Sequence, residues 1–139
     1  MSAEENKRIL ARGFDALNKQ DVNTFAEDIG EGYVNYSFPD ARGPEGFRQM
    51  IGMFFAAFPD MHVDVADMIA EGEKVASRGT MRGTHRGEFM GIPATGKPIE
   101  IGYSDVWRFE NGKAVENWVQ MDILGMLRQL GVAPAPGQQ

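Results

Sequence analysis

The sequence predicts an α+β domain in which three N-terminal helices pack on a curved, antiparallel four-stranded sheet and enclose an apolar pocket. Apolar residues recur at helical spacing before Pro59 and alternate with polar residues after it. Asn111-Gly112 is a strong hairpin signal. Six of the 17 glycines fall within residues 79–102, where the sheet would have to bend around a cavity. The order is therefore helices first and then a meander of strands.

The first two helices have clear start signals. Ser2 followed by Glu5 is a capping-box pattern, and apolar residues then recur at helical spacing. Asp21 can cap a second, short helix, which Gly30 or Gly32 would stop.

The third helix has the most regular apolar pattern, and it follows a short strand expected over residues 33–38. Pro44 suits a first helical turn. From Phe47 to Phe58 the apolar positions follow the spacing i, i+3, i+4, i+7, i+8 and i+11, and Pro59 ends the run.

The second half of the chain predicts the sheet. Strands are expected from residue 61 onward and over residues 74–84, 99–109 and 113–121, because apolar and polar residues alternate there. A closing helical turn is expected over residues 124–130.

Length and composition limit the organisation and the chemistry. The 139 residues suffice for one core, so residues 1–131 are expected to form a single domain. Residues 132–139 contain two prolines and are expected to be a loose tail. There is no Cys for a disulfide or a thiolate nucleophile, and two His residues make a metal site improbable.

Charge and hydropathy exclude two classes of partner. Residues 1–73 hold 14 of the 20 acidic side chains, and no Lys/Arg cluster offers a nucleic-acid surface. The longest apolar stretch, residues 50–58, is far too short to span a membrane. The charged N-terminal residues do not resemble a secretory signal. A cytoplasmic protein without nucleic-acid or membrane partners is expected.

Asp105 is the first candidate for acid/base chemistry. It shares a strand face with Tyr103 and Trp107, so a carboxylate would enter the apolar side of the sheet. Burial would raise its pKa, as a general acid or base requires. The alternative, weighted equally, is a structural hydrogen-bond acceptor.

Three further polar residues have both a functional and a structural interpretation. His85 ends an alternating strand at the mouth of the pocket, although a lone His is more often structural. Asp122 follows Trp118 on one strand face and could project beside it, or it could simply cap the last helix. Asn35 could donate a hydrogen bond to a substrate oxygen, or it could have no function.

Four segments together resemble one known family: residues 85–97 (HRGEFMGIPATGK), 105–113 (DVWRFENGK), 115–122 (VENWVQMD) and 127–131 (LRQLG). They are similar to the SnoaL-like polyketide cyclase family, within the NTF2-like superfamily. The resemblance implies an α+β cone, a homodimer formed through the sheet and no cofactor. It also implies an intramolecular aldol condensation of a polyketide methyl ester, with Asp122 as the acid/base.

Details of the site depend on this resemblance. Some members carry His at the pocket-lining position of Asp105, and the family usually has Glu-His-Trp where this chain has Glu116-Asn117-Trp118. The first hypothesis is an aldol-type cyclase or related proton-transfer enzyme acting on a small, apolar, carbonyl-containing ligand. Asp122 would remove the α-proton, and His85 and Asn35 would stabilise the enolate oxygen. The residues expected to hold the ring system and exclude water are Phe14, Phe54, Tyr103 and Trp118.

Two alternatives are kept. The protein could be a ligand-binding dimer without catalysis, whose acidic residues serve only as helix caps and strand contacts. An epoxide hydrolase of the limonene-epoxide type is disfavoured, because Gln120 stands where that family has its second Asp.

Overall fold

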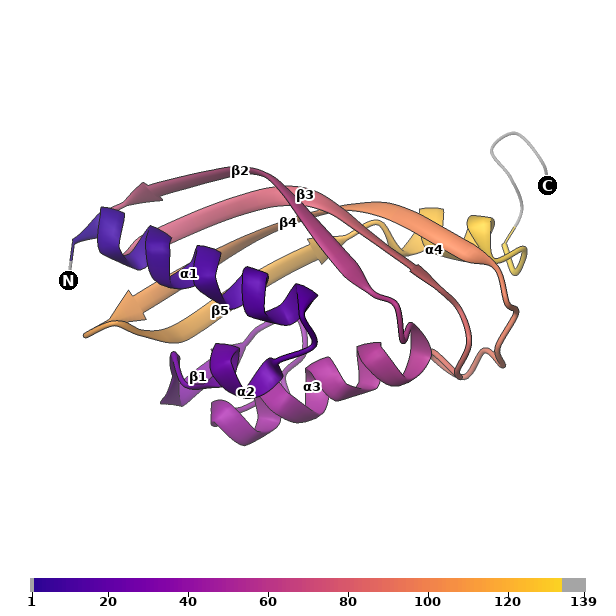
Figure 1. Cartoon of the computed structure of the whole chain (residues 1–139), viewed down its shortest axis with the longest axis horizontal. Coiled ribbons are helices and arrows are strands. Elements are labelled where there is room, and N and C mark those ends of the chain that lie inside the picture. Colours follow the sequence, from indigo (N-terminus) through magenta and orange to yellow (C-terminus); the bar gives the residue numbers. More distant parts are fainter. Residues whose placement is uncertain (1, 134–139) are drawn as a thin grey trace.

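The computed structural model describes residues 2–133, and its helices and strands follow the predicted order (Figure 1). In chain order they are α1 (Ala3–Asn18), α2 (Val22–Ala26), β1 (Ile29–Asn35), α3 (Gly43–Ala57), β2 (His62–Glu71), β3 (Lys74–Thr84), β4 (Pro98–Glu110), β5 (Lys113–Met121) and α4 (Ile123–Gln129). No helix within residues 2–133 is long and apolar enough to cross a membrane.

The sheet corrects one prediction. It has five strands in the order β1-β5-β4-β3-β2, and β1 pairs parallel to β5, so the sheet is mixed rather than four-stranded and antiparallel. The extra strand contains Gly30 and Gly32, which were expected to stop a helix. A Cβ on Gly30 would lie 3.2 Å from Val115 Cγ1. The missing side chain therefore lets β1 lie close against β5.

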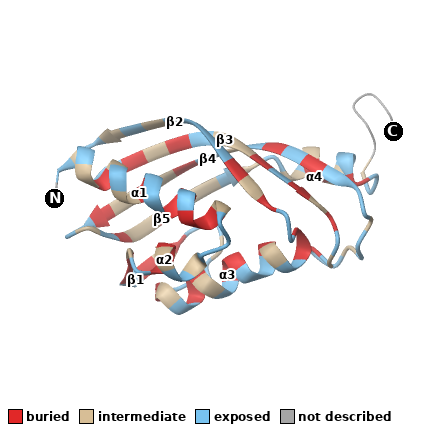
Figure 2. Ribbon diagram, viewed as in Figure 1, coloured by how far each residue is buried: buried red, intermediate tan, exposed pale blue. Residues whose placement is uncertain are grey.

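Helices α1, α2 and α3 lie against one face of the curved sheet, as predicted, and α4 lies at the far end of β4 (Figure 1). The core lies between these layers (Figure 2). On β4 every second residue from Ile99 to Phe109 is buried, apart from the half-buried Tyr103. That row brings the carboxyl of Asp105 into the core.

Gly79 marks a point of close approach between β2 and β3. The register of the two strands shifts between Val65 and Asp67. An added Cβ on Gly79 would lie 2.0 Å from the Asp64 carbonyl oxygen, closer than any side chain can come. Glycine is required here for the two strands to cross in this way.

The predicted closing helical turn is present as α4. Asp122 is its N-cap. The Gln129 side chain accepts a hydrogen bond from the backbone N–H of Glu100 at 2.7 Å and donates one to its carbonyl at 2.9 Å. This fastens α4 to the part of β4 that extends beyond β5. Residues 134–139 of the expected tail lie outside the described residues.

Candidate functional site

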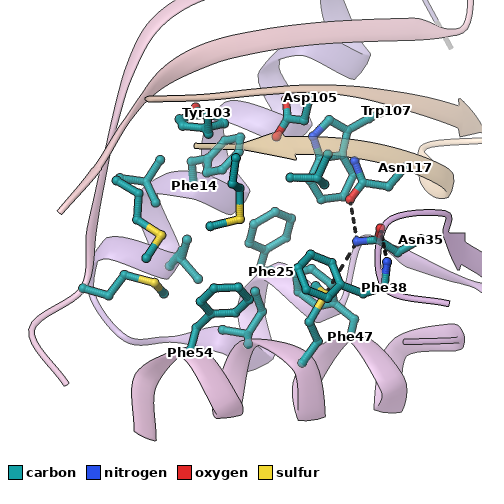
Figure 3. A pocket seen from close by; sticks show the side chains of 18 residues that line it. Phe14, Phe25, Asn35, Phe38, Phe47, Phe54, Tyr103, Asp105, Trp107 and Asn117 are labelled. Carbon is teal, nitrogen blue, oxygen red and sulfur yellow. Dashed lines mark hydrogen bonds between the residues drawn. The ribbon is translucent and has the colours of Figure 1, made fainter. Parts of the chain in front are cut away.

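An apolar pocket lies between the sheet and helices α1 and α3 (Figure 3). About 640 Å³ of it, its open mouth included, holds no protein atom. Most lining side chains are aromatic, aliphatic or Met; those with a hydroxyl, amide or carboxyl group are Asn35, Tyr103, Asp105 and Asn117. None of the described lining residues is a Lys, Arg or His. The pocket therefore suits an uncharged, largely apolar ligand.

Asp105 supplies the carboxyl group of this pocket. Its side chain is buried, and burial raises its pKa from the usual 3.8 to about 6. The Ser77 hydroxyl donates a hydrogen bond to Asp105 Oδ1 at 2.5 Å, which opposes this rise. The Trp107 indole N–H faces the carboxylate without meeting hydrogen-bond geometry (Figure 3). The carboxyl group can thus exchange a proton near neutral pH.

Tyr103 lies two residues before Asp105 and also lines the pocket. Its hydroxyl oxygen is 3.4 Å from Ser77 Oγ, so the phenol, the serine hydroxyl and the carboxylate form one chain of polar groups. Burial raises the pKa of the Tyr103 phenol, which keeps the phenol protonated. The pocket therefore presents a hydroxyl donor beside a base.

Asn35 and Asn117 form a second polar group deeper in the site. The Asn35 amide nitrogen is 3.2 Å from Asn117 Oδ1 and 3.2 Å from the Tyr33 hydroxyl. The Asn35 side-chain oxygen accepts hydrogen bonds from the backbone N–H groups of Ser37 and Phe38. Both amide protons and the carbonyl oxygen of Asn35 thus have partners within the protein.

Five of the residues predicted for the site do line the pocket, and they come from four elements. These are Phe14 on α1, Asn35 on β1, Phe54 on α3, and Tyr103 and Asp105 on β4. Their roles in binding or catalysis stay predictions.

His85 is buried but does not line the pocket. Its ring lies beside Phe58, and its Nδ1 accepts a hydrogen bond from the Thr95 backbone N–H at 3.2 Å. Backbone hydrogen bonds also join His85 to Gly96 and Lys97. His85 therefore closes the base of the loop between β3 and β4. The role of His85 in stabilising an enolate stays a prediction.

Asp122 lies where the helix-cap interpretation expects it, at the N-terminus of α4. Its side chain is exposed and accepts a hydrogen bond from the Gly125 backbone N–H at 2.9 Å, as a helix N-cap does. It is not among the residues that line the pocket. The structure thus keeps the two candidate carboxylates apart, and catalysis by Asp122 stays a prediction.

Trp118 lies on the other face of the sheet, contrary to the expectation that it lines the pocket. Side chains alternate along β5, and Asn117 and Val119 are the ones that face the pocket. The Trp118 ring stacks on Tyr36 with centroids 5.2 Å apart, and Lys74 Nζ lies 5.7 Å from it. A bound substrate could meet Trp118 only on that outer face.

Several pocket or near-pocket residues were not predicted as site residues, and three of them make specific contacts. Ser77 alternates with Val75 along β3, so its hydroxyl on an apolar face was an available signal. Asn117 is buried and lines the pocket, whereas its neighbour Trp118 lies on the outer face of the sheet. Phe38, which is expected at a strand end, lies in the turn after β1, and its ring centroid is 5.8 Å from that of Phe54.

Within residues 2–133, no three or more His, Asp or Glu side chains come together in a group that could hold a metal ion. The expectation that the protein works without a cofactor stays a prediction.

The fold agrees with comparisons to known proteins. The family model of the SnoaL-like polyketide cyclases matches residues 8–130, and the chain belongs to this family. The aklanonic acid methyl ester cyclase DnrD of Streptomyces peucetius is 29% identical over 128 residues, which cover 88% of this chain and 88% of that protein.

Two solved structures are similar over nearly the whole chain. IdmH of Streptomyces antibioticus is 36% identical with a TM-score of 0.78, covering 91% of this chain and 99% of that one. AclR of Streptomyces galilaeus, a suggested hydroxylase, is 30% identical with a TM-score of 0.85, and the match covers 96% of this chain and 100% of that one. These matches confirm the predicted family and α+β cone, whereas the named activities of the relatives differ. Family membership alone therefore does not define the reaction.

Proposed function

We propose that this protein is an acid/base enzyme that works without a cofactor and catalyses an intramolecular aldol condensation, or a related proton transfer, on an apolar carbonyl or polyketide ester substrate. The observation that carries the proposal is the position of Asp105, a buried carboxyl group in an apolar pocket with a pKa of about 6. At pH 7 such a group is about nine-tenths ionised, yet it is basic enough to accept a proton from carbon.

The geometry supports a reaction in two steps. The Asp105 carboxylate takes a proton from the carbon beside a carbonyl, and the C–H electron pair forms the enolate. The Tyr103 hydroxyl turns its single proton from Ser77 Oγ, 3.4 Å away, to the enolate oxygen and donates a hydrogen bond to it. The enolate carbon then bonds to a second carbonyl carbon, and the resulting alkoxide takes the proton back from Asp105. No proton or electron is gained or lost overall.

The apolar lining supports a neutral substrate. Phe14 and Phe54 face each other across the pocket from α1 and α3 and would hold an extended ring system away from water (Figure 3). A free carboxylate would find no cation among the described lining residues and would repel Asp105. An ester or ketone meets neither obstacle.

The test uses the substrate of the relative DnrD, aklanonic acid methyl ester, with product detected by chromatography and mass spectrometry. We expect the wild type to form a cyclised product of unchanged mass and Asp105→Asn to lose the activity by at least about a hundredfold. Asp122→Asn is the matched control, because it makes the same substitution at the other candidate carboxylate, and it should keep the activity. Full activity in Asp105→Asn with loss in Asp122→Asn would move the acid/base role to Asp122. Ligand binding without turnover would favour the non-catalytic alternative.

We also propose the homodimer expected from the resemblance, formed through the face of the sheet away from α1 to α3. On that face Tyr36 stacks on Trp118 and donates a hydrogen bond to Glu116 at 2.6 Å, which leaves an aromatic and charged surface. Light scattering should give the mass of two chains for the wild type and of one chain for a folded Trp118→Asp variant. A monomeric wild type would contradict this. The expected cytoplasmic location stays a prediction.

A further inference from the structure

Ser77 lies opposite Asp105 in the sheet, although it does not itself line the pocket. The two residues are directly paired in the register of β3 and β4. Both side chains are buried, with 4% of Ser77 and 6% of Asp105 exposed. The hydrogen bond from Ser77 Oγ to Asp105 Oδ1 is 2.5 Å long, in the short range typical of a hydroxyl bound to a charged carboxylate.

From this arrangement we infer that Ser77 is the positioning residue of the site: its hydroxyl holds Oδ1 of the Asp105 carboxylate and so fixes the orientation in which this group faces the pocket. The inference rests on the proposed role of Asp105 as the acid/base. The Trp107 indole N–H also faces the carboxylate and lowers its pKa, but only the Ser77 contact meets hydrogen-bond geometry. A carboxylate held by one oxygen keeps a fixed orientation, which proton transfer from carbon requires.

Ser77 also connects the base to the hydroxyl donor. Its Oγ lies 3.4 Å from the Tyr103 hydroxyl, and Tyr103 and Asp105 project from the same face of β4. A single buried hydroxyl on the neighbouring strand thus fixes the spacing of both reactive groups. Tyr103 and Tyr33 are the titratable groups near Asp105, and both remain neutral because burial raises the pKa of each phenol.

The contact predicts a specific effect on titration. Because the serine hydroxyl donates to the ionised form of Asp105, removing it should disfavour that form. We expect Ser77→Ala to raise the midpoint of Asp105 titration by about one to two pH units. Ser77→Thr keeps the hydroxyl and should stay within a few tenths of a unit of the wild type. Ser104→Ala is the matched control, because Ser104 adjoins Asp105 in the chain but is exposed on the other face.

The experiment has two arms. In the first, NMR follows the side-chain carboxyl carbon of Asp105 in protein labelled with ¹³C-aspartate, without substrate, with the signal identified by its loss in Asp105→Asn. In the second, the pH profile of kcat/KM is measured on aklanonic acid methyl ester. Ser77→Ala should lose about two- to tenfold at pH 7 and regain activity near pH 9, where Asp105 is ionised again. A purely structural loss would not be rescued by pH.

The two arms separate the inference from the proposed function. An unchanged or lowered Asp105 midpoint in folded Ser77→Ala, or an equal shift in Ser104→Ala, overturns the role of Ser77 whatever the activity shows. A raised midpoint with an unmoved kcat/KM profile supports the contact between Ser77 and Asp105 but removes Asp105 as the acid/base. Equal shifts in both arms support both.

Discussion

The buried carboxyl of Asp105 predicts that stability falls as pH rises through the acid range. In the unfolded chain the group has a pKa of 3.8, whereas burial raises it to about 6 in the folded protein. Below pH 3.8 both states carry the proton, so burial costs nothing through ionisation. Between pH 3.8 and 6 the unfolded state releases the proton first, which favours unfolding; above pH 6 the cost is constant.

The size of this effect follows from the two pKa values. A difference of about two units corresponds to about 3 kcal/mol, of which roughly 2–3 kcal/mol accumulates between pH 4 and pH 7. Since 6% of Asp105 is exposed, little screening by solvent reduces this figure. The free energy of unfolding of the wild type should therefore drop by this amount relative to Asp105→Asn, which cannot ionise.

Urea denaturation, followed by tryptophan fluorescence at several values between pH 4 and pH 8, measures the difference. Subtracting the Asp105→Asn curve cancels the contributions of the other titrating groups, because both proteins share them. The Asn side chain does not titrate, so its own effect on stability is independent of pH, and only the change with pH is compared. A pH-independent difference, or one in which the wild type gains on Asp105→Asn as pH rises, would refute the reasoning.

Three further substitutions test the framework around the pocket. Asp122→Ala should lower stability by about 1 kcal/mol in thermal denaturation, because it removes the cap of α4, whereas Asp122→Asn keeps a capping oxygen. Equal melting temperatures for these two variants would contradict the capping role. Gly79→Ala should cost about 1–3 kcal/mol in urea because of the clash with Asp64, whereas Gly102→Ala has 4.0 Å of room; equal losses would contradict this. Asn35→Ala should cost about 1–3 kcal/mol, because buried partners lose their hydrogen bonds, and no loss would contradict that network.

Periodicity predicted the fold well wherever a local pattern sets the structure. The capping box at Ser2, the regular apolar spacing of α3 and the Asn111-Gly112 turn are all short-range signals, and each appears in the structure as expected. The strand β1 was missed in part because its partner β5 is distant in sequence. Gly30 weakens the strand pattern in the local sequence. The advantage of glycine there is the room that it leaves for β5, and that depends on a strand distant in sequence.

The candidate site shows the same limit. Alternation along β4 predicted that Asp105 and Tyr103 share one face, and the apolar residues on that face indicated that it points into the core. On β5 both faces mix polar and large apolar residues, so the period could not tell whether Asn117 or Trp118 points inward. The partner of Asp105 was out of reach as well, because the register that pairs it with Ser77 depends on the length and path of the loop between β3 and β4.

Asp105 and Glu116 are carboxylates of one sheet with opposite electrostatic surroundings. Glu116 lies on the outer face between Arg108 and Tyr36, and hydrogen bonds from both lower its pKa. A carboxylate that serves only as a structural acceptor is expected to have such surroundings, since hydrogen-bond donors and a cation stabilise its charge. Asp105 instead has no cation among the described residues lining its pocket, and burial holds its pKa near 6 at a cost of about 3 kcal/mol at neutral pH. An apolar side chain there would fit the alternation of β4 and would avoid this cost. This costly placement of the carboxyl, with one oxygen held by Ser77, supports the proposed acid/base role over the alternative of simple ligand binding.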